Sequence, residues 1–258
     1  MTESGQTVVF EQPLNERVRT FLRLEFLFGQ YRHHRADVGD WGLRAALRTL
    51  LDLLSVVSRS DLRTEILKEL AEQHGALTRL QQRPGVDPSR LQSVLGEIGE
   101  AIAAMQGASA HAPAAILRDN EFLVSLLHRS TVPGGASAFD LPGFHYWLSQ
   151  PADRTARTVE HWFADLAPYE RAITLFLRLL RQSTEPSAEV ARGGVLVHTP
   201  QGEIELVRVL VPAAAAVYPE ISAGRHRFTV RFMSRSDPNA RAQQATGDIA
   251  FQLQCCAL

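Results

Sequence analysis

Apolar side chains recur at spacings of three and four residues through most of the segment between residues 14 and 182. This spacing is typical of α-helices that bury one face. Leu47, Leu50 and Leu54, for example, fall on a single stripe. The expected helices cover residues 15–30, 40–57, 62–80, 88–105, 118–129, 142–148, 152–166 and 168–182. The pattern therefore predicts one α-helical domain over residues 14–185.

Alternation of apolar and polar positions replaces the helical spacing after Pro186, and a period of two is typical of half-buried β-strands. The expected strands cover residues 195–199, 203–211, 225–232 and 248–256. A further short strand at residues 7–10 needs a partner, so we expect it to join the C-terminal strands. The sequence thus predicts an α+β fold, mainly α-helical, with one small antiparallel sheet in a β-domain made of residues 1–13 and 186–258.

The chain has 258 residues, a formal net charge of −1 and 45% hydrophobic residues. This balance disfavours a disordered chain and a protein that coats nucleic acid through its overall charge. No stretch approaches the roughly 18–20 uninterrupted apolar residues of a membrane span. The N-terminus lacks the basic and then apolar pattern of a signal peptide. We therefore expect a cytoplasmic protein without a membrane segment.

Common enzyme motifs are missing from the sequence: it has no phosphate-binding loop, dinucleotide fingerprint, nucleophile elbow or zinc-protease helix motif. His33 and His34 are adjacent, so they point in different directions and make a poor metal pair. His145, His161 and His226 have no cysteine or carboxylate at ligand spacing. We expect no enzymatic activity, no metal and no cofactor. A catalytic group assembled only in the folded chain is the alternative.

Cys255 and Cys256 are the only cysteines, and neighbouring cysteines rarely form a disulfide with each other. The last four residues formally fit a prenylation box, but its second position is not aliphatic and no polybasic run precedes it. A terminal β-strand is the favoured interpretation of this segment.

Residues 225–232 have the strongest chemical pattern in the chain. On a strand, Arg225, Arg227 and Arg231 would share one face, while Phe228 and Phe232 would point the other way. Five arginines and one aspartate lie between residues 223 and 241, a local charge of +4. This face is either an ordinary solvated surface or a binding surface for phosphates or carboxylates. Nucleic acid is an alternative partner, although stacking aromatics are absent from the arginine side.

Two more arginines, Arg59 and Arg63, lie four residues apart at an expected break between helices. For Arg63, an ion pair within its own helix with Glu65 or Glu69 is the alternative to a binding role. Position alone does not decide between these two interpretations.

Seven segments, in order along nearly the whole chain, resemble the ZapD family of bacterial Z-ring-associated proteins, which bind and bundle FtsZ. They are FEQPLNER with LRLEFL (10–17 and 22–27), RTEILKEL (63–70), PGVD (84–87), PGG (133–135), FDLP (139–142), YPEIS (218–222) and RFTVRFM (227–233). A match of seven ordered segments is far more specific than any single motif above.

The resemblance implies a non-enzymatic cytosolic homodimer that acts in cell division at mid-cell. It also implies a positively charged pocket between a helical domain and a β-domain that receives the C-terminal tail of FtsZ, so that the dimer cross-links filaments and stabilises the Z-ring. The pocket arginines of the family match Arg227, Arg231 and Arg59. We add Arg225, Arg63 and Arg118 on charge and expected proximity.

Overall fold

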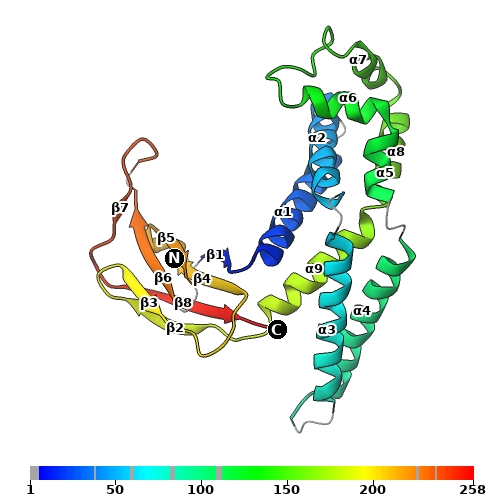
Figure 1. The fold of residues 1–258 in the computed structure, drawn as a ribbon. Coiled ribbons are helices and arrows are strands. Elements are labelled where there is room, and N and C mark those ends of the chain that lie inside the picture. The colour runs from blue at the N-terminus through cyan, green and yellow to red at the C-terminus, as the bar shows by residue number, and fades with distance from the viewer. Residues whose placement is uncertain are drawn as a thin grey trace, which may run out of the picture. The chain divides into compact units, whose positions relative to one another are not determined.

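Helices occupy the middle of the chain and strands its two ends in the computed structural model (Figure 1), which confirms the predicted α+β class. The structure describes residues 6–37, 39–58, 61–81, 85–108, 112–224, 227–235 and 237–258, without the side chains of residues 112, 114, 117 and 118. The chain divides into two units, Thr20–Phe176 and the pair of segments Met1–Arg19 and Leu177–Leu258. The division falls within two helices, α1 (Glu16–Ala36) and α9 (Ala167–Arg181).

The helical unit buries the apolar stripes that the spacing predicts. Its further helices are α2 (Asp40–Val57), α3 (Leu62–Leu80), α4 (Pro88–Gly107), α5 (Ala112–Asp119), α6 (Glu121–Arg129), α7 (Pro142–Leu148) and α8 (Ala152–Ala164). Leu47, Leu50 and Leu54 on α2 are all at most 2% exposed. Helices α3 and α4 lie side by side as an antiparallel pair (Figure 1).

Side-chain caps begin several of these helices. Asn15 and Asp87 accept hydrogen bonds from backbone N–H groups in the first turns of α1 and α4. Asn120 does the same for the N–H of Leu123, at 3.1 Å. Because an asparagine cap satisfies a free helix N–H, it favours a new start rather than continuation. The helix expected at 118–129 therefore begins at Glu121, as α6, and a separate helix that was not expected, α5, ends just before Asn120.

An aromatic cluster joins three helices of the helical unit. Phe122 of α6 lies 5.4 Å from Trp147 of α7, and Trp147 lies 6.2 Å from Trp162 of α8, measured between ring centroids. Phe144 of α7 also contacts Phe122 and Trp147. Aromatic pairs at these separations add to the free energy of burial, so the cluster holds α7 in place.

The other unit contains two antiparallel sheets rather than the single small sheet expected. The first has the order β1-β4-β8-β2, and the second has the order β3-β6-β5 with β7 beside β6. The strands are β1 (Thr7–Pro13), β2 (Ser187–Ala191), β3 (Val195–His198), β4 (Leu206–Pro212), β5 (Val217–Ala223), β6 (Phe228–Ser234), β7 (Gln243–Gln244) and β8 (Ile249–Cys256), with a 3-10 turn, η1 (Ala213–Ala215), after β4. The N-terminal strand β1 pairs with β4, so it joins the C-terminal strands as predicted.

Three strands, β2, β5 and β7, were absent from the sequence prediction. Strand β5 contains Pro219, which argues against a strand unless the strand lies at a sheet edge. Strand β5 does lie at an edge, paired only with β6 among the described strands, so proline is tolerated there. The strand expected at 225–232 begins instead at Phe228.

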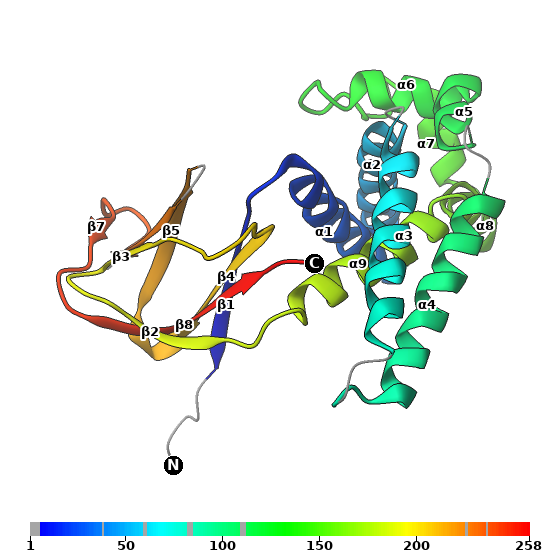
Figure 2. The same ribbon diagram turned by 60° about the horizontal axis from the view of Figure 1, so that its bottom comes forward.

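The core of this unit lies between its two sheets (Figure 2). Val207, Val209 and Val211 of β4 and alternate residues of β6 contribute to it, and each of these residues is at most 2% exposed. Phe232 meets Phe251 of β8 edge-on, with 5.0 Å between ring centroids. The period-two alternation that predicted these strands therefore marks their buried faces.

Both cysteines lie in strand β8, as the favoured interpretation of the C-terminus predicted. Cys256 is fully buried, and burial raises the pKa of its thiol to about 11. The thiol of Cys256 is thus neither accessible nor ionised near neutral pH. No helix within the described residues has the length and apolar character needed to cross a bilayer.

Candidate anion-binding face

Strand β6 carries Arg231, one of the three arginines predicted for this face, on its outer side. Phe228 and Phe232 are buried in the core, whereas Arg231 is exposed. Arg227 is also exposed and lies in the connection that precedes β6, where its carbonyl accepts a hydrogen bond from the N–H of Gly224 at 2.9 Å. The predicted orientation of the phenylalanines and of Arg231 is therefore confirmed.

The neighbouring strands change the chemistry of this face. Glu220 of β5 is the direct cross-strand partner of Arg231, and Val195 of β3 is its partner on the other side. Val197, which is the partner of Thr229, is 57% exposed. Directly opposite residues have Cβ atoms about 4.5–5.5 Å apart, so they share one local surface. The outer face of β3-β6-β5 thus combines arginine, one carboxylate and exposed valine.

The described structure does not place the other four predicted arginines beside the outer face of β3-β6-β5. They are Arg59, Arg63, Arg118 and Arg225. Arg59 and Arg225 lie outside the described residues, and so does the side chain of Arg118, whose backbone is in α5. Arg63 belongs to the helical unit, whereas Arg227 and Arg231 belong to the sheet unit.

Arg63 has a structural role at the end of a neighbouring helix. Its Nε donates to the carbonyl of Met105 at 3.1 Å, and its Nη2 donates to the carbonyl of Gln106 at 3.2 Å. The last carbonyls of a helix lack partners within the helix and carry partial negative charge. Arg63 therefore satisfies the C-terminal end of α4, an interaction that was not among those considered from the sequence.

A second arginine cluster lies on the outer face of the other sheet and was missed from the sequence. Glu11 of β1 accepts two hydrogen bonds from Arg181 of α9 and one from Arg208 of β4, each at 2.8 Å. Gln254 of β8 accepts from Arg208 at 2.6 Å and donates to the carbonyl of Arg181 at 2.7 Å. The cluster joins three strands to the end of α9.

Both arginines of this cluster are engaged, because Glu11 accepts hydrogen bonds from each of them and Gln254 accepts another from Arg208. Burial alone would raise the pKa of the Glu11 carboxyl, but hydrogen bonds and charge attraction from Arg181 and Arg208 lower it below its usual value. Arg181 and Arg208 therefore stabilise the fold through Glu11 rather than offering their charges to a ligand. Only the strand register, which brings Glu11 opposite Arg208, reveals the pair, since the two residues are far apart in sequence.

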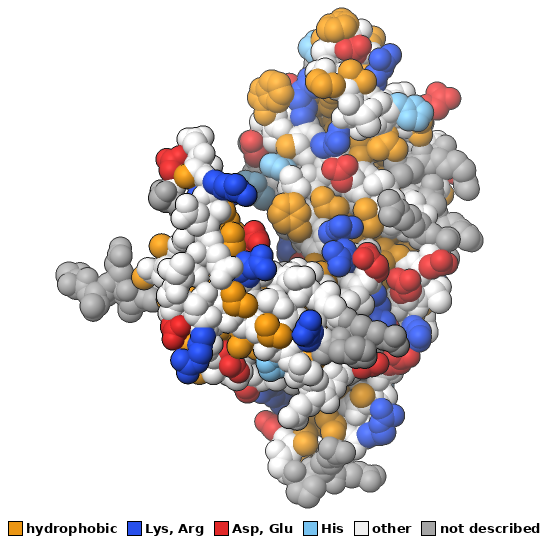
Figure 3. Space-filling view, turned by 60° about the vertical axis from the view of Figure 1, so that its left-hand side comes forward, with side chains coloured by type: hydrophobic (Ala, Val, Ile, Leu, Met, Phe, Trp, Pro, Cys, Tyr) orange, Lys and Arg blue, Asp and Glu red, His pale blue; other side chains and the backbone are white. Residues whose placement is uncertain are grey.

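On one face of the molecule, the described basic side chains do not form one continuous patch. On the face of the molecule drawn in Figure 3, they (blue) are separated by uncharged and hydrophobic surface, and acidic side chains (red) lie among them. Within the described residues, no group of three or more His, Cys, Asp or Glu side chains is arranged to hold a metal ion.

Comparison with known proteins identifies the family. A family model for ZapD, a cell division protein, matches residues 22–231. The cell division protein ZapD of Methylococcus capsulatus is 38% identical over 255 residues, which cover 97% of this chain and 98% of that protein. The proteins of the same name from Bordetella petrii and Yersinia pestis are 37% and 32% identical over 261 and 256 residues, with at least 97% of each chain covered. The family model spans most of the chain and these relatives match along nearly their whole length, so the chain belongs to the ZapD family of cell division proteins.

Proposed function

We propose that this protein binds the C-terminal tail of FtsZ and cross-links FtsZ filaments, so that it stabilises the Z-ring in the cytoplasm at mid-cell. In this proposal the protein is a homodimer without enzymatic activity, cofactor or metal. Membership of the ZapD family supports the cell division role. The exposure of Arg227 and Arg231, with Val195 directly opposite Arg231, is the observation that supports tail binding.

The outer face of β3-β6-β5 suits an extended peptide that contains carboxylates and apolar residues. Arg227 and Arg231 are four residues apart, which corresponds to roughly 13 Å along an extended chain. Each guanidinium offers a planar, charge-assisted pair of hydrogen bonds to a carboxylate. Val195 and Val197 supply apolar contact on the same face. A peptide lying along β6 would therefore meet both kinds of contact.

Bundling follows from valency. One contact with a short tail is weak, because two exposed arginines give modest attraction in water. A two-fold dimer presents two such faces, and a filament presents many tails. Once one face has bound, the second face meets tails at a high effective concentration, so the overall affinity exceeds that of a single contact. Cross-linking then needs no enzymatic step.

The test is co-sedimentation with purified FtsZ filaments. The wild-type protein should pellet with filaments and increase the mass of bundles, whereas the Arg227→Glu/Arg231→Glu double variant should do neither. Arg157→Glu/Arg171→Glu is the matched control, because it makes the same charge change at two exposed positions of the helical unit. Full binding by a double variant with unchanged helical circular dichroism would rule out this face as the tail site.

Nucleic acid binding by the same arginines is the less well supported alternative. Sequence-tolerant binding to single strands relies on aromatic side chains that stack on bases. Phe228 and Phe232 are buried at 2% and 0% exposure, so neither is available to stack. A gel shift with mixed DNA and RNA discriminates: binding there, without any effect on FtsZ sedimentation, would favour this alternative.

A further inference from the structure

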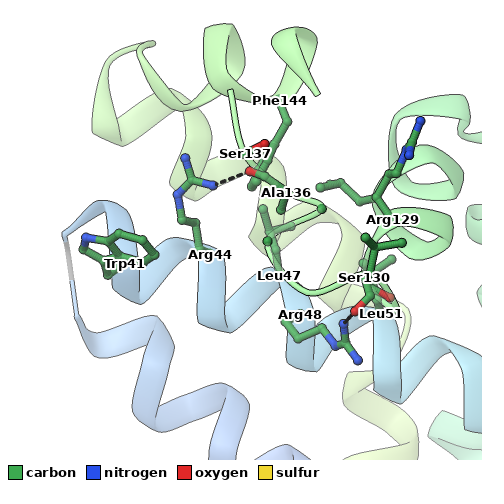
Figure 4. A pocket seen from close by; sticks show the side chains of 14 residues that line it. Trp41, Arg44, Leu47, Arg48, Leu51, Arg129, Ser130, Ala136, Ser137 and Phe144 are labelled. Atoms are coloured by element: carbon green, nitrogen blue, oxygen red, sulfur yellow. Dashed lines mark hydrogen bonds between the residues drawn. The ribbon is translucent and has the colours of Figure 1, made fainter. Parts of the chain in front are cut away.

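The helical unit contains a pocket that the FtsZ proposal does not use. The pocket lies between α2, α6, the start of α7 and the loop over residues 130–137, and its volume is about 470 Å³ (Figure 4). Leu47, Leu51 and Leu126 supply apolar lining, and two aromatic rings, Trp41 and Phe144, stand on another side. Ligand pockets in proteins are commonly about 300–1,000 Å³ and largely apolar, so this one is large enough to receive a bulky side chain and its neighbours.

The loop that covers the pocket has a defined shape. Arg44 donates to the carbonyl of Ala136 at 3.0 Å, and Arg48 donates to the carbonyl of Ser130 (Figure 4). A Cβ atom at Gly135 would lie 2.5 Å from the carbonyl oxygen of Arg129, so only glycine fits this close approach. Because the loop is already ordered before a ligand arrives, binding loses less conformational entropy than it would with a mobile loop.

Two aromatic rings and one backbone carbonyl hold the Arg44 guanidinium in position at this pocket. Its Cζ atom lies 5.5 Å from the ring centroid of Trp41 and 4.9 Å from that of Phe144, within the range of cation–π attraction. The guanidinium has five N–H groups, of which one makes the bond to Ala136. Trp41 is 81% exposed, so folding of the helical core does not account for its position. Both side chains have contact surface left for a partner.

The charges of the lining side chains indicate whether the bound group of the partner is anionic or cationic. Arg44, Arg48 and Arg129 line the pocket, and no carboxylate of the described residues does. Asp52 lies 3.5 Å from Arg48, and Asp140 lies 3.8 Å from Arg129, which offsets part of the charge of those two arginines. Arg44 instead contacts a carbonyl and two rings. The local field therefore favours an anionic group beside Arg44.

We propose that this pocket binds a peptide segment of a partner protein in which a bulky apolar side chain is flanked by Asp or Glu residues. The apolar side chain enters the space lined by Leu47 and Leu51, and a neighbouring carboxylate pairs with Arg44. A second copy of this chain is the poorer occupant, because a two-fold contact centred on the pocket would bring the arginines of this lining close to their own copies. The proposal does not rest on the FtsZ site, since every lining residue belongs to the helical unit.

The test uses the full-length protein and three labelled synthetic peptides. The first has a central Phe between two pairs of Glu; in the second Ala replaces the Phe, and in the third Lys replaces each Glu. Fluorescence polarisation should show saturable binding of the first peptide and at least about tenfold weaker binding of the other two. The second peptide loses the burial of an apolar ring, and the third loses a charge-assisted contact.

Variants locate the binding to the pocket. Trp41→Ala removes an apolar contact surface and Arg44→Gln removes a charge, so each should weaken binding of the first peptide about tenfold or more, and both positions lie outside the helical core. Phe139→Ala and Arg157→Gln are the controls, because both residues are exposed and neither lines the pocket. Binding that is unaffected by Trp41→Ala and Arg44→Gln would overturn the proposal.

Two further results would overturn it as well. One is the absence of binding by all three peptides at millimolar concentration. The other is self-association of the protein that both pocket variants abolish while no peptide binds, measured by analytical ultracentrifugation. That second result would assign the surface to contact between copies of the chain.

Discussion

Glu220 of β5 lies directly opposite Arg231 of β6, and both side chains are exposed on the outer face of their sheet. The sequence shows three arginines of alternating position without an intervening acid, yet the sheet supplies a carboxylate from the neighbouring strand. Opposite charges at a cross-strand pair attract one another by about 0.2–1 kcal/mol. An anionic ligand of Arg231 must therefore compete with Glu220.

Under the proposed function, this relationship predicts that Glu220→Gln strengthens binding of the FtsZ tail. Removal of the competing carboxylate leaves the Arg231 guanidinium available and lowers repulsion toward the ligand. We expect an affinity about two- to fivefold higher at low salt, measured by fluorescence polarisation with a labelled tail peptide. Glu203→Gln is the control, because Glu203 is an exposed acid in the same unit outside the strands. An unchanged affinity in Glu220→Gln would place the tail elsewhere.

Salt should weaken the same contact. Exposed charges are screened over about 8 Å at physiological ionic strength and over shorter distances above it. We expect the dissociation constant of the tail peptide to rise steadily across a sodium chloride series. Arg231→Gln should bind more weakly at every concentration and show a shallower salt dependence, because one screened pair is already lost. A dissociation constant that stays constant across the series would show that apolar contact dominates.

The sequence pattern predicts most of this fold, because the pattern depends on local periodicity. The buried stripe of Leu47, Leu50 and Leu54 and the alternation in β6 follow from the repeat lengths of a helix and a strand. Strand β5 was missed, since Pro219 reads as a break wherever the sheet edge is unknown.

Which arginines are engaged in structural contacts depends on partners that are distant in sequence, and these are not visible in a local pattern. The pairing of Glu11 with Arg208 requires the register of β1 on β4. The bonds from Arg63 to the end of α4 likewise require the packing of α3 on α4. A count of charges along the chain treats such arginines as free, although the structure shows that they are engaged.

The turn between β2 and β3 contains two glycines with positive φ, Gly193 and Gly194, and only Gly194 also lies too close to a neighbour to accept a Cβ atom. Gly194 has φ +77°, and a Cβ atom there would lie 2.1 Å from the carbonyl oxygen of Ala245. Gly194→Ala should lower the free energy of unfolding by about 2 kcal/mol or more, since the backbone is strained and a neighbour must move. Gly202→Ala is the control, because a Cβ atom at Gly202 meets nothing within 4 Å. Equal urea midpoints for the two variants would contradict this account.

Glu11→Gln should destabilise the sheet unit. The side chains of Glu11, Arg181 and Arg208 are 20%, 23% and 19% exposed, so the loss of the carboxylate leaves two arginines partly buried without their counter-charge. We expect a loss of about 2 kcal/mol in the free energy of unfolding, less than for a fully buried pair because water still reaches the group. Urea unfolding measures it, with Glu203→Gln as the exposed control. A loss as small as that of the control would show that water replaces the carboxylate at no cost.

The stabilisation by Glu11 should depend on pH with a definite sign. Hydrogen bonds and charge attraction from Arg181 and Arg208 outweigh burial and lower the pKa of Glu11 below its usual 4.5. A carboxyl with a lowered pKa in the folded state contributes its full stabilisation above its unfolded pKa and loses it as the pH falls through the folded pKa.

The difference in unfolding free energy between wild type and Glu11→Gln should therefore be constant from neutral pH down to 4.5 and shrink below it. Burial raises the pKa of Glu170, which gives the opposite dependence, so only the difference between the two proteins isolates Glu11. Urea titrations at a series of pH values measure this difference. If it instead grew as the pH fell, Glu11 would be protonated more readily in the folded chain, and the two arginines would not be holding its charge.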